Sequence, residues 1–81
     1  MRIKKLLGMQ VLDMDANDIG KVTDVDFNSV NGRIDKIAIS LKKNILSHDE
    51  VMIHYDNIQS IGDYVLLKIN IDRDNKDKTE D

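Results

Sequence analysis

The sequence predicts an all-β domain, a small closed or partly open antiparallel β-barrel of about five to six strands. Short runs of β-branched and other aliphatic residues recur at period two, which is typical of strands with one buried face. Segments rich in Asn, Asp and Gly separate these runs and predict tight turns. The chain has 81 residues, of which 41% are hydrophobic, enough for one domain with a small core. We expect that domain to span residues 1–71, and we expect residues 72–81, which include no apolar side chain, to form a disordered charged tail.

The chain is organised around a predicted hairpin at residues 19–41. Two runs rich in β-branched residues flank the segment 28–32, which ends in Asn-Gly, a strong hairpin signal. A two-residue Asn-Gly loop would pair odd with even positions and place Phe27 opposite Lys36. A connection of three or five residues keeps the apolar residues together and requires a left-handed conformation at Gly32.

This register assigns a face to each strand residue of the hairpin. The residues expected to point inward are apolar, and those expected to point outward are mostly charged. Val22 and Ile34 have the opposite phase, so each is expected to mark a β-bulge or a strand end. The inward set is Val25, Phe27, Ile37, Ile39 and Leu41, and the outward set is Asp24, Asp26, Lys36 and Ser40.

Three further strands are predicted around this hairpin. Residues 9–13 form the first, residues 51–55 form a short one, and residues 63–71 form the longest, with apolar residues at period two. The segment 56–60 is expected to be a connecting turn. The turn after the first strand lacks a glycine, so Asn17 is expected to take the left-handed position there.

Three motifs, in this order, resemble the PRC-barrel family of small β-barrel modules. Residues 6–11 resemble its opening strand, and Gly-Lys-Val-x-Asp at residues 20–24, followed by a turn and Arg33-Ile34, resembles its central hairpin. Residues 51–67 resemble its closing segment. The resemblance covers roughly residues 5–71 and implies the same small barrel, in a stand-alone single-domain form similar to archaeal members.

Composition argues against several kinds of partner. The net charge of −3 argues against direct nucleic-acid binding, because nucleic-acid binders usually carry a clear basic excess. No run approaches the ~20 apolar residues of a membrane-spanning helix. Gly8 and Gln10 interrupt the apolar stretch near the start too early for a signal peptide. We therefore expect a cytoplasmic protein without membrane insertion.

Candidate metal-binding and catalytic residues do not form a convincing site. Residues 13–17, Asp-x-Asp-x-Asn, begin like a calcium loop, but the pattern then departs from it, and such residues often hydrogen-bond their own backbone in turns. His48, Glu50 and His54 extend too far along a strand to bind one metal ion. The two outward aspartates of the hairpin are expected to face a lysine across the strands. We expect no metal, no cofactor and no catalytic residues, and hence no enzyme.

An exposed apolar cluster is the remaining candidate site. Met52, Tyr64 and Leu66 have the outward phase on two strands that a short connector joins, so the strands could be neighbours. We predict a protein interface there. Alternatively, the apolar pair Ile45 and Leu46, in the loop before residue 51, or the turn at Leu6 and Leu7 folds over these side chains as part of the core. Ile45 and Leu46 are also candidates for the interface itself.

The family resemblance implies a non-catalytic, protein-binding adaptor or scaffold. Members of the family form half of a bacterial ribosome-maturation factor that docks on a ribosomal protein, and the cytoplasmic part of the photosynthetic reaction centre's H subunit. Stand-alone archaeal members resemble scaffold components of the tubulin-like cell-division machinery. For this chain the resemblance implies an adaptor in archaeal cell division or, alternatively, an accessory factor in RNA processing or ribosome assembly. A small core also favours a homodimer, which would bury additional surface.

Overall fold

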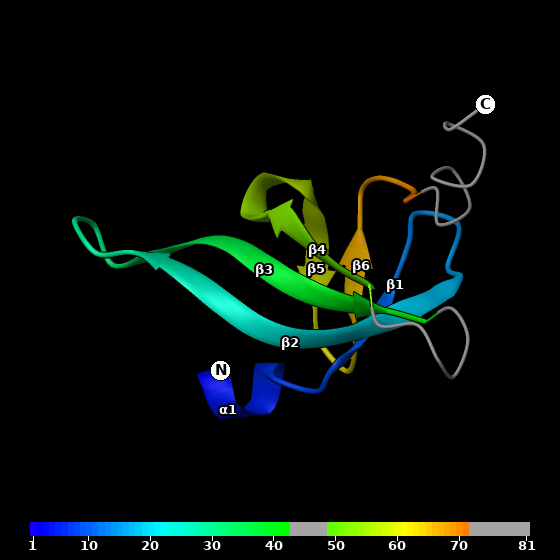
Figure 1. Ribbon diagram of the computed structural model, residues 1–81, viewed down its shortest axis with the longest axis horizontal. Coiled ribbons are helices and arrows are strands. Elements are labelled where there is room, and N and C mark those ends of the chain that lie inside the picture. Colours follow the sequence, from blue (N-terminus) through cyan, green and yellow to red (C-terminus); the bar gives the residue numbers. More distant parts are fainter. Residues whose placement is uncertain (43–48, 72–81) are drawn as a thin grey trace.

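The computed structural model describes residues 1–42 and 49–71, which form a single curled β-sheet with one short α-helix and one 3-10 helix. The predicted tail, residues 72–81, and the apolar pair Ile45 and Leu46 lie outside the described residues. In chain order the elements are α1 (Ile3–Leu6), β1 (Gln10–Leu12), β2 (Asp18–Asn28), β3 (Arg33–Leu41), β4 (Asp49–His54), the 3-10 helix η1 (Tyr55–Asn57), β5 (Ile58–Ile61) and β6 (Val65–Leu67) (Figure 1).

The sheet curls into a half-barrel, which confirms the predicted fold class. Its six strands follow the order β4-β3-β2-β1-β6-β5. The pair β1–β6 is parallel, whereas every other neighbouring pair is antiparallel. The prediction of a purely antiparallel sheet is therefore wrong at one junction. The segment 56–60, predicted as a connecting turn, contains most of β5, which pairs antiparallel with the other side of β6.

The central hairpin has the predicted register, held by two bulges. Val25 lies opposite Ile37, so the inward residues of both strands face the same side. The register shifts between Val22 and Asp24, and again on the β3 side between Ile34 and Lys36. The out-of-phase residues therefore mark bulges, as the sequence predicts.

The tip of the hairpin differs from the prediction in length. Asn28 lies opposite Arg33, which leaves four connecting residues rather than three or five, and the second bulge corrects the resulting change of parity. Gly32 has φ +74°, as predicted, and its N–H donates to the Asn28 carbonyl at 2.8 Å. The Asn28 side chain accepts the N–H of Val30 at 2.9 Å. Local hydrogen bonds thus close the turn.

The core lies inside the curl and is built from aliphatic side chains of all six strands and α1. Gly20 permits the close approach of β2 to β3, because a Cβ atom there would collide with the Ser40 carbonyl oxygen. The buried apolar cluster is Leu6, Val11, Ile19, Val22, Ile37, Ile39, Leu41, Ile53, Ile58, Val65 and Leu67.

Residues 24–35, called the arm below, extend the hairpin beyond the barrel (Figure 1). The partner strands stop before it, since β1 pairs with β2 no further than Lys21 and β4 pairs with β3 no further than Lys36. Phe27 has the predicted inward phase, but 51% of it is exposed, so its prediction as a core residue is wrong. Phe27 lies on the arm, beyond the ends of β1 and β4, so no flanking strand covers it within the described residues.

Two other local predictions are also corrected. The long strand expected at residues 63–71 is reduced to β6, after which the chain turns and Ile69 and Ile71 pack half-buried against the core. The Lys68 N–H donates to the Asn57 carbonyl instead of extending a ladder. In the turn before β2, Ala16 rather than Asn17 is left-handed, with φ +66°.

Candidate protein-interaction surfaces

The residues predicted to form an interface lie on separate parts of the sheet. Met52 is 50% exposed on β4, Tyr64 is 43% exposed in the turn before β6, and Leu66 is half-buried in β6. The expectation that their strands are neighbours is wrong, because β4 forms one edge of the sheet and β6 lies between β1 and β5. Strand pairing therefore does not unite the three side chains, and Met52 forms a separate site.

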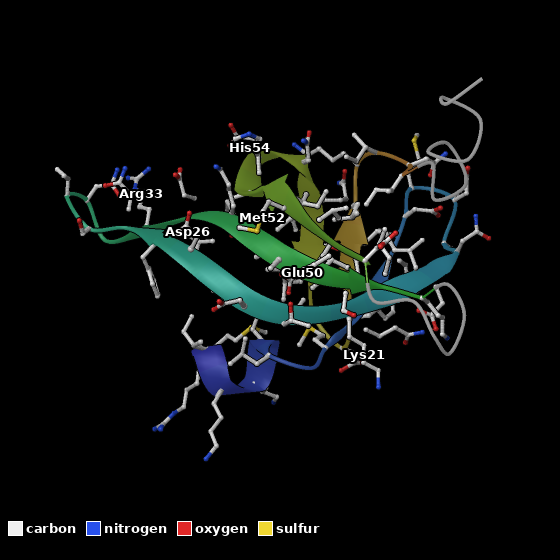
Figure 2. The ribbon with its side chains drawn as sticks, in the orientation of Figure 1. Lys21, Asp26, Arg33, Glu50, Met52 and His54 are labelled. Carbon is white, nitrogen blue, oxygen red and sulfur yellow. The ribbon has the colours of Figure 1, made fainter. Side chains whose placement is uncertain are left out.

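Met52 lies near the centre of the outer face of β2, β3 and β4 (Figure 2). It stands directly opposite Ala38, whose small side chain is itself buried. Charged and polar residues flank this apolar centre on β4, with Glu50 on one side and His54 on the other. The Thr23 hydroxyl donates to Glu50 Oε2 at 2.6 Å, which holds that carboxylate against the sheet. The result is a polar face with one accessible apolar side chain.

The β4 strand also leaves a sheet edge without a partner. Six residues of β4 pair with β3 on one side, and no strand within residues 1–42 and 49–71 pairs with its other side. An edge strand presents unpaired N–H and C=O groups, which form a template for a further strand. Met52 and this edge together provide both apolar and backbone contacts.

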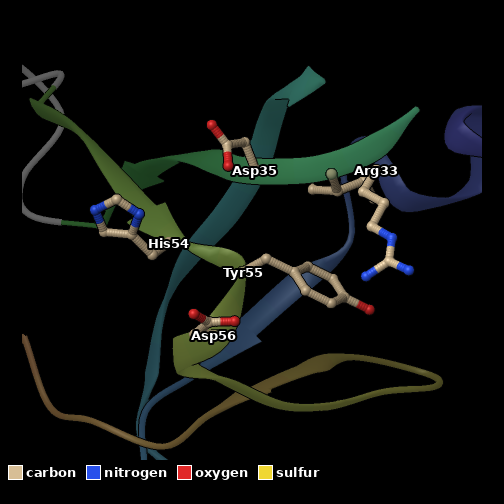
Figure 3. A pocket seen from close by; sticks show the side chains of 6 residues that line it. Arg33, Asp35, His54, Tyr55 and Asp56 are labelled. Carbon is tan, nitrogen blue, oxygen red and sulfur yellow. The ribbon is translucent and has the colours of Figure 1, made fainter. Parts of the chain in front are cut away.

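A hollow of about 520 Å³ lies where β4 passes into η1 and the arm leaves the barrel. Figure 3 shows the Tyr55 ring beside the Arg33 side chain, with His54 on the opposite side. His54, Tyr55 and both carboxylates, Asp35 and Asp56, are exposed. A solvated site of mixed charge lacks the buried acid or base that a catalytic pocket usually provides.

The turn with the calcium-like pattern is organised by hydrogen bonds of its own. Asp13 is buried, and its Oδ1 accepts the N–H groups of Asp15 and Asn17, both at 2.9 Å. The Asn17 side-chain amide donates to Asp13 Oδ2 at 3.2 Å. Both carboxylate oxygens therefore hold the turn, which confirms its interpretation as a backbone-bonded turn. Among the described residues, no group of three or more His, Asp or Glu side chains could hold a metal ion.

An ion pair ties the start of β2 to the end of β3. Lys42 Nζ lies 2.7 Å from Asp18 Oδ2, and this hydrogen bond lowers the pKa of Asp18 below its ordinary value. Both side chains are substantially exposed, so the pair secures the barrel end rather than forming a reactive site.

Sequence analysis missed a second exposed apolar region, on the arm and beside α1. Val30 is 94% exposed at the tip of the arm, where an apolar residue within an otherwise polar turn was the available signal. At the base of the arm, an apolar groove of about 240 Å³ runs between α1 and Ile34. Its lining residues are Met1, Arg2, Ile3, Leu6, Ile34, Tyr55 and Ile61.

Within the described part of the chain, no helix is long and apolar enough to cross a membrane. No curated protein matches the chain. A family model described as PRC-barrel domain matches residues 1–73, nearly the whole length. The match agrees with the three motifs and with the curled six-stranded sheet. The chain therefore belongs to the PRC-barrel domain family.

Proposed function

We propose that this domain is a non-catalytic adaptor that binds a partner protein along β4. The observation that carries the proposal is an edge strand that has no second neighbouring strand among the described residues and has an exposed methionine at its centre. Few apolar side chains on the sheet's outer face are as accessible as Met52, which is 50% exposed.

An extended segment of the partner would add to the sheet beside β4. Backbone hydrogen bonds supply affinity in this mode, and alternate side chains supply specificity. Burying the exposed part of Met52 would contribute about 1–2 kcal/mol. Glu50 and His54 flank Met52 and favour a partner segment that places complementary polar groups on both sides of an apolar residue.

The absence of a catalytic role is part of the proposal. The one buried charged side chain among the described residues, Asp13, holds its own turn. The remaining carboxylates and both aromatic hydroxyls in the described region are at least partly exposed to water. Such groups suit recognition better than acid–base chemistry.

We place the adaptor in the cytoplasm as a scaffold component of archaeal cell division, a role that rests on the family resemblance. A ribosome-assembly factor is the second candidate. It is favoured by Asp24 and Asp26 on the outer face of an acidic protein, which would attract a basic ribosomal protein.

Affinity capture from the native lysate, with and without nuclease, tests the proposal. Immobilised wild-type protein should retain a specific partner, and Met52→Asp should abolish retention, because a charge at a desolvated contact is costly. A partner released by nuclease would instead support the RNA-associated candidate.

Phe27→Asp provides a matched control for the capture experiment. Phe27 is 51% exposed, almost the same fraction as Met52, but it lies on the arm rather than on β4. The control should retain the partner as wild type does. Equal retention by wild type and Met52→Asp would overturn the assignment of β4 as the docking strand.

A further inference from the structure

The β4 strand is placed to pair with one further strand. On one side, β3 pairs with it along the whole of Asp49–His54, and no strand within residues 1–42 and 49–71 pairs with its other side. An edge of this kind offers backbone N–H and C=O groups to an added strand. Because backbone groups accept many extended segments, the side chains of β4 decide which segment is preferred.

The side chains of β4 are self-complementary about Met52. On the outer face, Met52 stands between Glu50 and His54, each two positions away. On the core face, Val51 and Ile53 stand on either side of Met52. An antiparallel pair of β4 strands centred on Met52 therefore places Glu50 opposite His54 at both ends. In the same register, Val51 lies opposite Ile53, so that carboxylate meets imidazole and apolar meets apolar.

Residues on β3 and β2 reinforce the charge at each end of β4. Each end belongs to a row of side chains that lie opposite one another across the three strands (Figure 2). Lys36 beside His54 makes one row basic near the edge, whereas Glu50 makes the other row acidic at the edge. The Thr23 hydroxyl donates to Glu50 Oε2 at 2.6 Å and so holds that carboxylate in position. From β2 to β4 the rows are Asp26, Lys36, His54 and Lys21, Ser40, Glu50.

We propose that β4 pairs antiparallel with β4 of a second copy of this chain, about a two-fold axis at Met52. Each Glu50 then faces the second copy's His54, with the second copy's Lys36 next to it. The two methionine side chains, each 50% exposed in the single chain, cover each other at the axis. The pairing uses the free side of β4 in both copies, so it closes at two chains.

This inference rests on the proposed use of β4 as the docking strand and names one occupant for it. Because one strand edge accepts one added strand, self-association and partner binding exclude each other. A partner therefore displaces the second copy from β4. The two proposals fail separately: a monomeric purified protein would leave partner capture through Met52 intact, and a dimer that captures no partner would leave the self-pairing intact.

Charge exchange between the two ends of β4 gives the first test. Glu50→Lys alone and His54→Glu alone each place like charges opposite each other at both ends. Sedimentation equilibrium should therefore show self-association at least about tenfold weaker than that of wild type. An equimolar mixture of the two variants, and a double variant carrying both changes, should regain the mass of two chains, because opposite charges face each other again.

The double variant separates pairing from folding, since its two changes match only across the two copies. Both positions are exposed, and circular dichroism should show that all variants are folded. A monomeric wild type at high micromolar concentration would overturn the inference. A double variant that associates as weakly as Glu50→Lys or His54→Glu alone would also overturn it.

Disulfide trapping gives the second test and reports the register. The chain has no cysteine, so a single introduced thiol can form a disulfide only with another chain. Oxidised glutathione should crosslink Met52→Cys efficiently, because directly opposed residues have Cβ atoms about 4.5–5.5 Å apart, close to disulfide geometry. His54→Cys should not crosslink with itself, since its two copies lie about 13 Å apart along the strands. A mixture of Glu50→Cys and His54→Cys should crosslink.

Phe27→Cys is the matched control for the trapping experiment. Phe27 is 51% exposed, nearly the same fraction as Met52, but it lies on the arm and away from β4. Its thiol should remain uncrosslinked under conditions that crosslink Met52→Cys. Equal crosslinking of the two variants, or crosslinking of His54→Cys alone as fast as that of Met52→Cys, would overturn the pairing about Met52.

Discussion

The two ends of the β2–β3 ladder have the same alternating pattern but different surroundings. At the barrel end, Val22 and Ile39 face each other and are fully buried, because β1 and β4 extend the sheet on both sides. At the arm end, Phe27 and Ile34 face each other in the same phase, but the flanking strands have stopped. Alternation therefore reports which face a residue is on, whereas the extent of the neighbouring strands decides whether that face is buried.

The largest expected effect on stability comes from comparing Ile37 with Phe27, two residues on the same face of the ladder. Ile37→Ala should reduce the free energy of unfolding by about 3 kcal/mol, because Ile37 is fully buried and leaves a cavity. Phe27→Ala should cost less than about 1 kcal/mol, since half of the ring is already in water. Chemical denaturation provides both values. Equal losses would show that the arm belongs to the core.

Two glycines allow the same comparison for the backbone. Gly20→Ala, at the barrel end, should cost about 2–3 kcal/mol, because the new Cβ collides with the Ser40 carbonyl oxygen. Gly32→Ala, at the arm end, should cost about 1 kcal/mol, because it meets only the penalty of a positive φ with open space around it. Thermal unfolding should show a larger decrease in melting temperature for Gly20→Ala than for Gly32→Ala. A reversed order would contradict the tight crossing at Gly20.

The smallest expected effect concerns the ion pair at the barrel end. The pKa of Asp18 is lowered from its ordinary 3.8 by Lys42, so its stabilisation is present above pH 3.8 and is lost as pH falls further. Asp18→Asn should therefore cost roughly 0.5 kcal/mol at pH 7 and nothing once Asp18 is protonated in the wild-type fold. Unfolding curves at several pH values measure the difference. A difference that persists at the lowest pH would assign the effect to something other than charge.

Much of the fold can be predicted from local patterns. Period-two alternation identifies the hairpin and the pairing of Val25 with Ile37, and its two violations identify both bulges. The left-handed Gly32 follows from the turn sequence. These features depend on residues that are close in sequence, where side-chain phase and turn chemistry are sufficient.

Features that depend on distant strands are not available from the same patterns. Apolar alternation at residues 63–71 predicts a long strand, but β6 ends at Leu67 because its neighbours, β1 and β5, are short. Likewise, the predicted proximity of Met52 to Tyr64 requires a strand order that the sequence does not encode locally. The candidate surfaces follow from where strands end, which only the assembled sheet shows.

Hydrogen exchange of the wild-type protein tests the central claim most directly. Amides of the arm, residues 24–35, should exchange at least about tenfold faster than those of the barrel end, because β1 and β4 stop before the arm. Amides that pair β2 with β1 should exchange slowly, since the sheet continues on both sides of β2 there. Arm amides that are as strongly protected as those of the barrel end would contradict the account.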